Sequence, residues 1–344
     1  MAGPRRPALS ATAERGWWRR TTLATVGPMT RLLTTITAAL AVLAGAAPGP
    51  TLAATGRPDT YLVSREPGTL PEGIAVAPDG TMYVTSVATG VVYRGHTGRA
   101  ELRPFLPAGG DGRTAAAGVH LDRRGRIFVA GWDTGALFVH ATDGRLLARR
   151  VAPGAALNDL AVTADAVYVT DSATGTVWRA SLAGDRIGQL VPWLTEADFP
   201  AAPGFLNGIV VTPDGRLALV ADQGTGEPGS ERLWRVDLSG RTATPVEVTG
   251  GHLGADGLLI EGERLYGVVN FPDGEGGWHV AVNLALLDAD RRTARVVGQS
   301  RPAGLAQSPT TIARDGDRLL WVNSQLNAAA PTPPFTVTPV PGLC

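Results

Sequence analysis

Four side chains able to bind a metal ion recur at one position of a repeated sequence pattern. The pattern occurs six times, as in Pro71-Glu-Gly-Ile-Ala-Val and Leu206-Asn-Gly-Ile-Val-Val, and we call its second residue the anchor. The anchors are Glu72, Gly118, Asn158, Asn207, Asp256 and Thr310. Two carboxylates and two amide carbonyls offer hard oxygen ligands with a total charge of minus two. Such ligands suit a divalent cation, and Ca²⁺ is the best match. Zn²⁺, Mg²⁺ and Mn²⁺ remain options, although no Cys or His occupies an anchor.

The spacing of the anchors indicates how residues so far apart in the chain could meet. Successive anchors are 40 to 54 residues apart, which is typical of β-propeller blades. In each copy an aliphatic run leads through a turn, such as Asp79-Gly80 or Asp214-Gly215, to a second apolar run, which indicates a hairpin. We therefore predict an all-β, six-bladed β-propeller over residues 55–327, closed by a strand near Tyr61. A radial array of this kind places all anchors at one mouth of a central channel.

Turn chemistry offers a second interpretation of the same residues. Asn-Gly and Asp-Gly pairs form turns readily, so Asn158, Asn207 and Asp256 could simply begin strands. Turn formation does not explain why four oxygen-bearing residues share one phase of the repeat. Burying Glu72 close to Asp256 is also costly unless a cation lies between them. The set as a whole therefore favours a metal site.

The anchor segments resemble those of the SMP-30/gluconolactonase/LRE-like family. The resemblance rests on Glu72-Gly, Asn158-Asp, Asn207-Gly-x-x-x-x-Pro-Asp-Gly and Asp256-Gly, and it covers about residues 60 to 327. It implies a six-bladed propeller with a divalent metal at the channel mouth and hydrolysis of lactones or organophosphate esters. It further implies that Glu72, Asn207 and Asp256 are the core ligands and that Asn158 touches the metal or the bound substrate.

Two positions depart from the family's usual pattern. Family members that hydrolyse sugar lactones often carry an Arg two residues before the third anchor, where this chain has Ala156. The first repeat also reads Glu-Gly-Ile rather than Glu-Gly-Pro. The resemblance therefore extends to the metal anchors but not to the handling of a sugar acid lactone.

The chemistry expected of such a site is hydrolysis. A cation polarises a carbonyl or phosphoryl oxygen, and Asp256 could orient or deprotonate the attacking water. His120, on the inner strand of the second repeat, and His279, in an extended connection of the fifth, are candidate substrate contacts. We expect an exported metal-dependent lactone or ester hydrolase with a small-molecule substrate. The alternatives are a phosphotriesterase and a non-catalytic binding or scaffold propeller with a structural Ca²⁺ site.

Composition and the ends of the chain set further expectations. The 31 basic residues, all arginine, balance 31 acidic ones, so charge gives no reason to expect nucleic-acid binding. Residues 1–54 read as an export signal, with Arg31 before a short apolar run over residues 32–47 and a start at Met29 as an alternative. We expect cleavage, secretion, a monomer and no stable membrane span, with a retained anchor as the alternative. Residues 328–344 are Pro-rich and predict a loose tail.

Overall fold

The computed structural model describes residues 56–227, 229–272, 277–303 and 308–343. The chain divides into two units, Met1–Ala54 and Thr55–Cys344, and the second contains all the described residues. The expected export signal therefore lies outside the described part of the chain. Among the described residues no helix is long and apolar enough to cross a bilayer, and helical structure amounts to two short 3-10 turns, η1 (Gly110–Gly112) and η2 (Glu196–Asp198).

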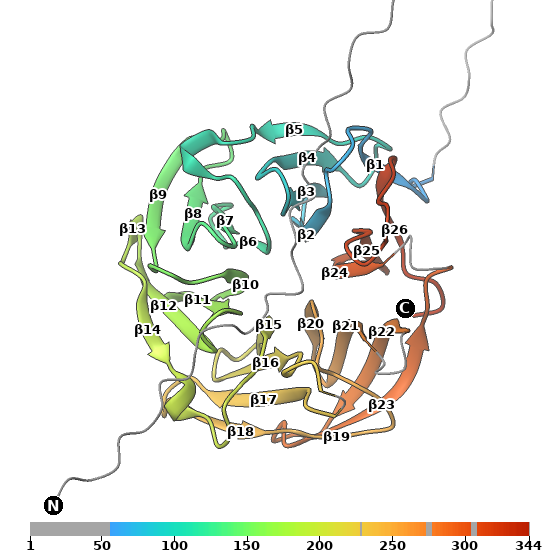
Figure 1. Ribbon diagram of the computed structural model, residues 1–344. Helices are drawn as coiled ribbons and strands as arrows, with labels where there is room; N and C mark the ends of the chain where they lie inside the picture. The colour runs from blue at the N-terminus through green and yellow to red at the C-terminus, as the bar shows by residue number, and fades with distance from the viewer. Residues whose placement is uncertain (1–55, 228, 273–276, 304–307, 344) are drawn as a thin grey trace, which may run out of the picture. The chain divides into compact units, whose positions relative to one another are not determined.

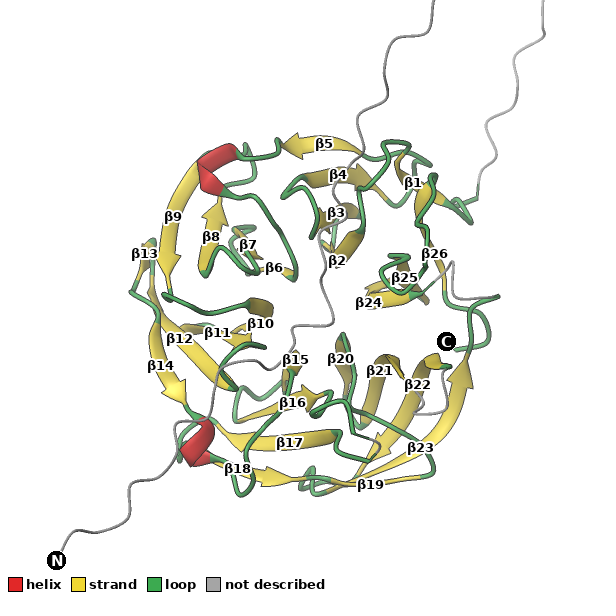
Figure 2. Cartoon of the chain, viewed as in Figure 1, coloured by secondary structure: helices red, strands yellow, loops and turns green. Residues whose placement is uncertain are grey.

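The predicted all-β, six-bladed propeller is confirmed. Six sheets, antiparallel except for one outer strand pair, form the blades, and the strand that begins within two residues of the anchor is the innermost of each (Figures 1 and 2). Tight turns join the strands, as where Gly80 adopts φ +84° between β2 and β3, a conformation that glycine reaches without strain. The strands of the first three blades are β2 (Pro71–Val76), β3 (Thr81–Ser86), β4 (Val92–His96) and β5 (Arg103–Leu106); β6 (Val119–Leu121), β7 (Ile127–Ala130), β8 (Ala136–His140) and β9 (Leu146–Val151); and β10 (Leu157–Val162), β11 (Ala166–Asp171), β12 (Thr176–Ala183), β13 (Arg186–Ile187) and β14 (Val191–Leu194).

The last three blades complete the ring, and the fifth differs from the others in its longer strands. Its second and third strands contain 9 and 10 residues. The strands are β15 (Leu206–Val211), β16 (Leu217–Asp222), β17 (Arg232–Asp237) and β18 (Thr242–Pro245); β20 (Leu258–Glu261), β21 (Arg264–Pro272), β22 (Trp278–Leu287), β23 (Thr293–Ser300) and β19 (Glu247–Thr249), the last parallel to β23; and β24 (Pro309–Asp315), β25 (Arg318–Asn323), β26 (Phe335–Pro339) and β1 (Tyr61–Ser64).

The sixth blade is built from both ends of the described chain. Its strand order is β1-β26-β25-β24, so the strand at Tyr61–Ser64 closes the ring as predicted. The prediction of a loose tail over residues 328–344 is wrong for Phe335–Pro339, which pair with β25 on one side and β1 on the other. Phe335 and Val337 are fully buried, because alternate residues of this strand face the core.

The six innermost strands form a closed ring around the central channel. Each contacts the next in the order β2, β6, β10, β15, β20, β24 and back to β2 (Figure 1). Six clusters of buried apolar side chains fill the spaces between neighbouring blades. Because the core lies between blades, the position of every inner strand is fixed by packing on both sides.

A bulge interrupts the inner strand at the anchor in four blades. In the first blade Pro71 pairs with Ser86 but Ile74 pairs with Val84, so three residues of β2 oppose two of β3. The same irregularity follows Leu157, Leu206 and Pro309. A bulge of this kind adds one residue and redirects the side chains beside it. It therefore releases the anchors from the regular alternation of the strand.

Candidate functional site

The four oxygen-bearing anchors are all buried at the start of their inner strands. Glu72, Asn158 and Asn207 lie in β2, β10 and β15, and Asp256 lies two residues before β20. Their relative exposures are between 3% and 7%. Polar groups this deeply buried are costly unless each has a partner. Their hydrogen bonds therefore show which oxygens remain for a ligand.

A chain of side-chain amides joins the fourth anchor to the fifth. Asn207 Nδ2 donates to Gln223 Oε1 at 3.1 Å, and Gln223 Nε2 donates to Asn270 Oδ1 at 3.0 Å. Asn270 Nδ2 in turn donates to Asp256 Oδ2 at 2.5 Å and to the carbonyl of Pro309 at 3.0 Å. The chain fixes the Asp256 carboxylate from the side of the fourth and sixth blades.

The third anchor is held in the same manner. Asn158 Nδ2 donates to Ser172 Oγ at 3.0 Å, and Ser172 Oγ donates to the carbonyl of Leu206 at 2.6 Å. Ser172 follows the last residue of β11 just as Gln223 follows the last residue of β16. In both blades this residue accepts a hydrogen bond from the side-chain NH₂ group of the anchor, which leaves the amide oxygen of the anchor for another partner.

Two fully buried oxygens of the anchors have no hydrogen-bond partner. They are Glu72 Oε2 and Asn207 Oδ1. The backbone carbonyl of Glu72, in contrast, accepts hydrogen bonds from the hydroxyls of Thr310 at 2.7 Å and Thr311 at 2.8 Å. The sixth anchor, Thr310, thus supports the first. An unpartnered buried carboxylate oxygen calls for a cation or a donor that the chain itself does not supply.

Three carboxyl groups at or beside the anchors influence one another, two of them buried (Glu72 and Asp256) and one partly exposed (Asp159). Burial raises the pKa of Glu72 well above its ordinary value, and the nearby Asp256 and Asp159 raise it further. Burial also raises the pKa of Asp256 to about 7, against the opposing effect of hydrogen bonds from Asn270 and Asn207. The pKa of Asp159 rises to about 7 because of burial, despite hydrogen bonds from the backbone N–H groups of Leu160 and Ile209. A divalent cation among these groups would relieve the cost of ionising them.

These observations fit a hard divalent cation. The unpartnered oxygens belong to Glu72 and Asn207, and amide and carboxylate oxygens are what Ca²⁺ binds. Within the described ranges, no three or more His, Cys, Asp or Glu side chains are grouped closely enough to hold a metal ion. A site here would therefore combine the carboxylates of Glu72 and Asp256 with the amide oxygens of Asn158 and Asn207.

The two candidate histidines lie in different surroundings. His120 is on β6, in the wall of the channel. Its side chain is accessible to solvent, but the surrounding protein still partly desolvates the ring. That enclosure lowers the pKa of the imidazole. His279 is on β22, and its ring packs against the rings of His252 and Phe271. His279 is thus part of an aromatic cluster on the fifth blade.

Three polar residues of this region do not follow from anchor phase alone: Asp159, Gln223 and Asn270. Asp159 occupies the position after the anchor, where three of the six copies have glycine, and this exception is the signal that could have identified it. Gln223 shares its phase with Ser172. Asn270 shares this phase as well, because it lies three residues after Gly267 of β21 just as Gln223 lies three residues after Val220 of β16, and Gly267 and Val220 pair with equivalent residues of the inner strands.

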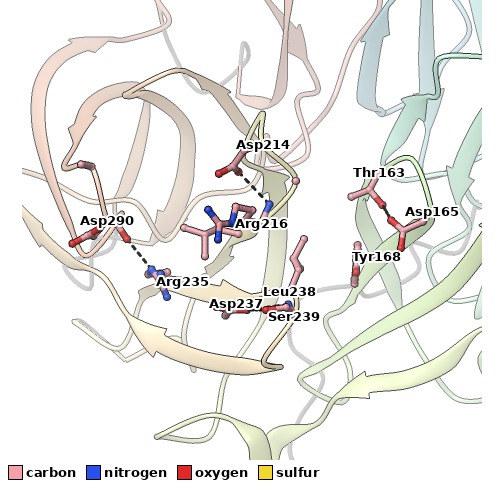
Figure 3. Close-up of a pocket in the computed structure, with 13 residues that line it drawn as sticks. Thr163, Asp165, Tyr168, Asp214, Arg216, Arg235, Asp237, Leu238, Ser239 and Asp290 are labelled. Carbon is pink, nitrogen blue, oxygen red and sulfur yellow. Dashed lines mark hydrogen bonds between the residues drawn. The ribbon is translucent and has the colours of Figure 1, made fainter.

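A cavity of about 640 Å³ lies away from the anchors (Figure 3). Its walls come from turns at the opposite ends of the strands, among them Thr163–Asp165 and Asp214–Arg216, and no anchor lines it. Its carboxylates serve local turns: Asp214 Oδ1 accepts from the backbone N–H of Arg216, and Asp237 Oδ1 from that of Ser239. We therefore place the candidate functional site at the anchors.

Comparisons with known proteins support the fold. No protein-family sequence model matches the chain, and no curated protein is significantly similar in sequence. Among solved structures, a gluconolactonase of Xanthomonas campestris is 16% identical, with 83% of this chain and 99% of that chain covered and a TM-score of 0.55. A calcium-binding regucalcin of Agrobacterium tumefaciens is 21% identical over 83% and 96%, with a TM-score of 0.52. A virginiamycin B lyase of Staphylococcus aureus is 11% identical over 81% and 97%, with a TM-score of 0.54.

These identities show the propeller fold alone. The structural neighbours include propellers of the gluconolactonase and regucalcin kind, which the anchor segments resemble, and also a lyase. Proteins with this architecture thus catalyse more than one kind of reaction. A function therefore has to be argued from the residues of the site.

Proposed function

We propose that this protein is a metal-dependent hydrolase of the SMP-30/gluconolactonase/LRE-like kind that opens a lactone or related ester at the mouth of the channel. The observation that carries the proposal is the pair of unpartnered buried oxygens, Glu72 Oε2 and Asn207 Oδ1. They belong to anchors that are more than one third of the chain's length apart, and both interact with a third anchor: Asp256 raises the pKa of Glu72, and a hydrogen bond from Asn207 lowers that of Asp256. Such an arrangement is costly in a stable fold unless it serves a bound ion.

The cation would be held by Glu72, Asn158, Asn207 and Asp256, with Ca²⁺ the best match for four oxygen donors. When bound, it would polarise the substrate's carbonyl oxygen and stabilise the negative charge that develops there. The shared fold of a calcium-binding regucalcin and a gluconolactonase supports this combination of ion and chemistry.

Asp256 is the residue we propose for proton transfer. Its carboxylate accepts a proton from water as the water oxygen attacks the carbonyl carbon. The bond from that carbon to the ester oxygen then breaks, and the leaving oxygen takes up a proton, so a lactone becomes a hydroxy acid. Asn270 holds the carboxylate in place for this step.

The substrate class follows from what surrounds the anchors. Position 156 is an alanine whose backbone N–H is bound by Asp171 Oδ1 at 2.9 Å, so no guanidinium at this position can grip a sugar acid. We therefore propose an uncharged lactone or ester, with His120 in the channel wall as a contact. A phosphotriester is the second class that the same ion could polarise. We further propose that the protein acts as a secreted monomer, released by cleavage within residues 1–54.

Metal analysis and assays with and without chelator test this function. We expect about one Ca²⁺ per purified chain and turnover of lactones or esters that EDTA abolishes and Ca²⁺ restores. Asp256→Asn should lower kcat by about 10² to 10⁴-fold, the usual contribution of a general base. The exposed Asp133, changed to Asn, is the matched control and should keep full activity.

Other outcomes point to other functions. If the metal is present and chelation lowers only stability, with no turnover of lactones, esters or phosphotriesters, the protein is a binding or scaffold propeller with a structural ion. If Asp256→Asn keeps both full metal content and full turnover, the proposed role of Asp256 is wrong.

A further inference from the structure

A carboxylate and an imidazole form a close pair beside the fifth blade. Glu231 Oε1 lies 2.6 Å from His252 Nδ1. Glu231 ends the connection between β16 and β17, and His252 precedes β20, so the pair links the fourth blade to the fifth. The side chain of Glu231 is 14% exposed and that of His252 is 42% exposed. The pair is therefore held by protein on one side and open to solvent on the other.

The carboxylate determines which nitrogen of His252 is free to bind. A carboxylate on Nδ1 holds the proton there, so the neutral ring presents the lone pair of Nε2 outward. Within the part of the chain that the structure describes, no hydrogen bond reaches this Nε2. The backbone of His252 is also fixed, because its carbonyl accepts from Asn283 Nδ2 at 2.9 Å, and Gln299 supports Asn283 at 2.8 Å.

A second imidazole lies next to the first. The ring centres of His252 and His279 are 4.8 Å apart. Phe271 packs against both rings, at 5.4 Å and 5.0 Å. Phe271 and His279 are cross-strand partners in the extended hairpin of β21 and β22, so backbone pairing fixes the position of His279.

The separation of the two rings matches that of two imidazoles on one metal ion. With metal–nitrogen bonds of about 2.0–2.1 Å and tetrahedral or square geometry, two such rings have centres about 4.5 to 5 Å apart. A carboxylate on the far nitrogen of a metal-binding histidine is the usual supporting contact, and it orients the ring and strengthens the ligand. Glu231 supplies that contact here.

We propose that His252 and His279 bind a divalent transition-metal ion, with Glu231 supporting His252. Imidazole nitrogens favour Cu²⁺ and Zn²⁺ over the hard cations that oxygen ligands prefer. This site is separate from the anchors and does not rest on the proposed function. Two protein nitrogens leave positions for water or a small ligand. Metal binding there would also tie the β16–β17 connection to the fifth-blade hairpin.

Copper binding to the tag-free protein tests the proposal directly. We expect one Cu²⁺ per chain at this site, with an electron paramagnetic resonance spectrum that shows coupling to two nitrogens. Calorimetric titration with Zn²⁺ should show binding that His252→Gln and His279→Gln each weaken at least about 10-fold. Glu231→Gln should weaken it by about 10 to 100-fold, the effect usual for such supporting contacts.

Two control variants separate this site from the rest of the chain. His96→Gln removes an exposed histidine of the first blade and should leave Cu²⁺ and Zn²⁺ affinity unchanged. Asp256→Asn alters the anchors and should leave the two-nitrogen Cu²⁺ spectrum unchanged. A wild-type spectrum with fewer than two coupled nitrogens overturns the proposal without any variant. Unchanged affinity in a folded His279→Gln protein overturns it as well.

Discussion

The residue after each anchor decides how closely two neighbouring blades approach at the mouth of the channel. A Cβ atom on Gly208 would lie 2.5 Å from the carbonyl oxygen of Asp256, and one on Gly73 would lie 2.6 Å from that of Ala117. Neither distance is tolerable, so glycine here is required by close backbone contact rather than by an unusual φ angle. Because Asp256 is itself an anchor, this contact sets the separation of two candidate ligands.

Gly208→Ala tests the contact. We expect a loss of about 1–3 kcal/mol in the free energy of unfolding, because the added methyl group must push β15 away from the segment that carries Asp256. Urea unfolding gives this value. Gly56→Ala is the control, because a Cβ there has no atom within 4 Å. Equal stability of the two variants would show that the inner strands move apart freely.

At the scale of elements, the bulged inner strand and the closing strands organise the molecule. Three residues oppose two at the anchor in four blades, so the anchor side chains are directed by a shared backbone irregularity. The sixth blade adds a different constraint, because β26 lies between β25 and β1 and joins the two ends of the ring. Removal of contacts in β26 should therefore affect the entire ring.

Phe335→Ala measures the contribution of β26. Phe335 is fully buried, so its truncation should cost about 3–5 kcal/mol in the free energy of unfolding. Thermal or urea unfolding is the measurement. Leu147→Ala, at a position that is 36% exposed in β9, serves as the control and should cost much less. A small effect of Phe335→Ala would mean that the C-terminal strand is dispensable.

A buried histidine in β8 makes stability depend on pH. His140 Nε2 lies 3.3 Å from Arg113 Nη1, a group that can only donate, so the ring is neutral with its proton on Nδ1, which donates to the carbonyl of Gly144 at 3.2 Å. Burial lowers the pKa of His140, and the positive charge of Arg113 also contributes. The stabilising effect of the neutral ring is present above the unfolded pKa of about 6.5 and is lost as the pH falls through the folded pKa.

As the pH is lowered below about 6.5, we expect His140 to reduce the free energy of unfolding by up to about 1.4 kcal/mol per pH unit. Urea unfolding at pH 7.5 and pH 5.5, compared between wild type and His140→Gln, isolates the contribution. His96→Gln, an exposed site, should keep the wild-type pH dependence. An identical dependence in His140→Gln would contradict the assignment.

At the scale of the whole molecule, the positions of residues within the repeat predicted the ring of blades but not the side chains that bind the anchors. The six copies predicted six blades and the inner position of each anchor, because equivalent positions in a radial array are equivalent in space. The polar partners of the anchors could not be predicted in the same way. Gln223 and Asn270 each bind the anchor of their own blade and bind each other across the boundary between the fourth and fifth blades, and such contacts depend on side-chain directions.

The Pro-rich C-terminal segment shows a different failure. Its composition predicts a loose tail, but Phe335-Thr-Val-Thr alternates apolar and polar residues as a strand does. Composition averaged over the segment hid this short alternation. His279 likewise could be placed near the fifth blade, but its ring neighbours His252 and Phe271 depend on the hairpin register.

Metal removal should affect the whole ring, because the anchors belong to four different blades. We expect EDTA to lower the Tm and Ca²⁺ to restore it, with a stabilisation of about 2.7 kcal/mol when Ca²⁺ is at 100 times its dissociation constant. Differential scanning calorimetry gives this value. A Glu72→Gln, Asp256→Asn double variant should no longer respond to Ca²⁺. A response as large as that of the wild type would place the ion elsewhere.

The pairing of β1 with β26 has a consequence for how the chain matures. Translation proceeds at about 5–20 residues per second, so β1 waits on the order of tens of seconds before its partner is made. During that time β1 is an unpaired edge that can join other chains, and once β25 has been made its open side is briefly a second such edge. A nascent chain that stalls before Phe335 has every anchor but no closed ring. Faithful production of this protein therefore depends on its last-made strand, and chaperones that shield strand edges should raise its yield.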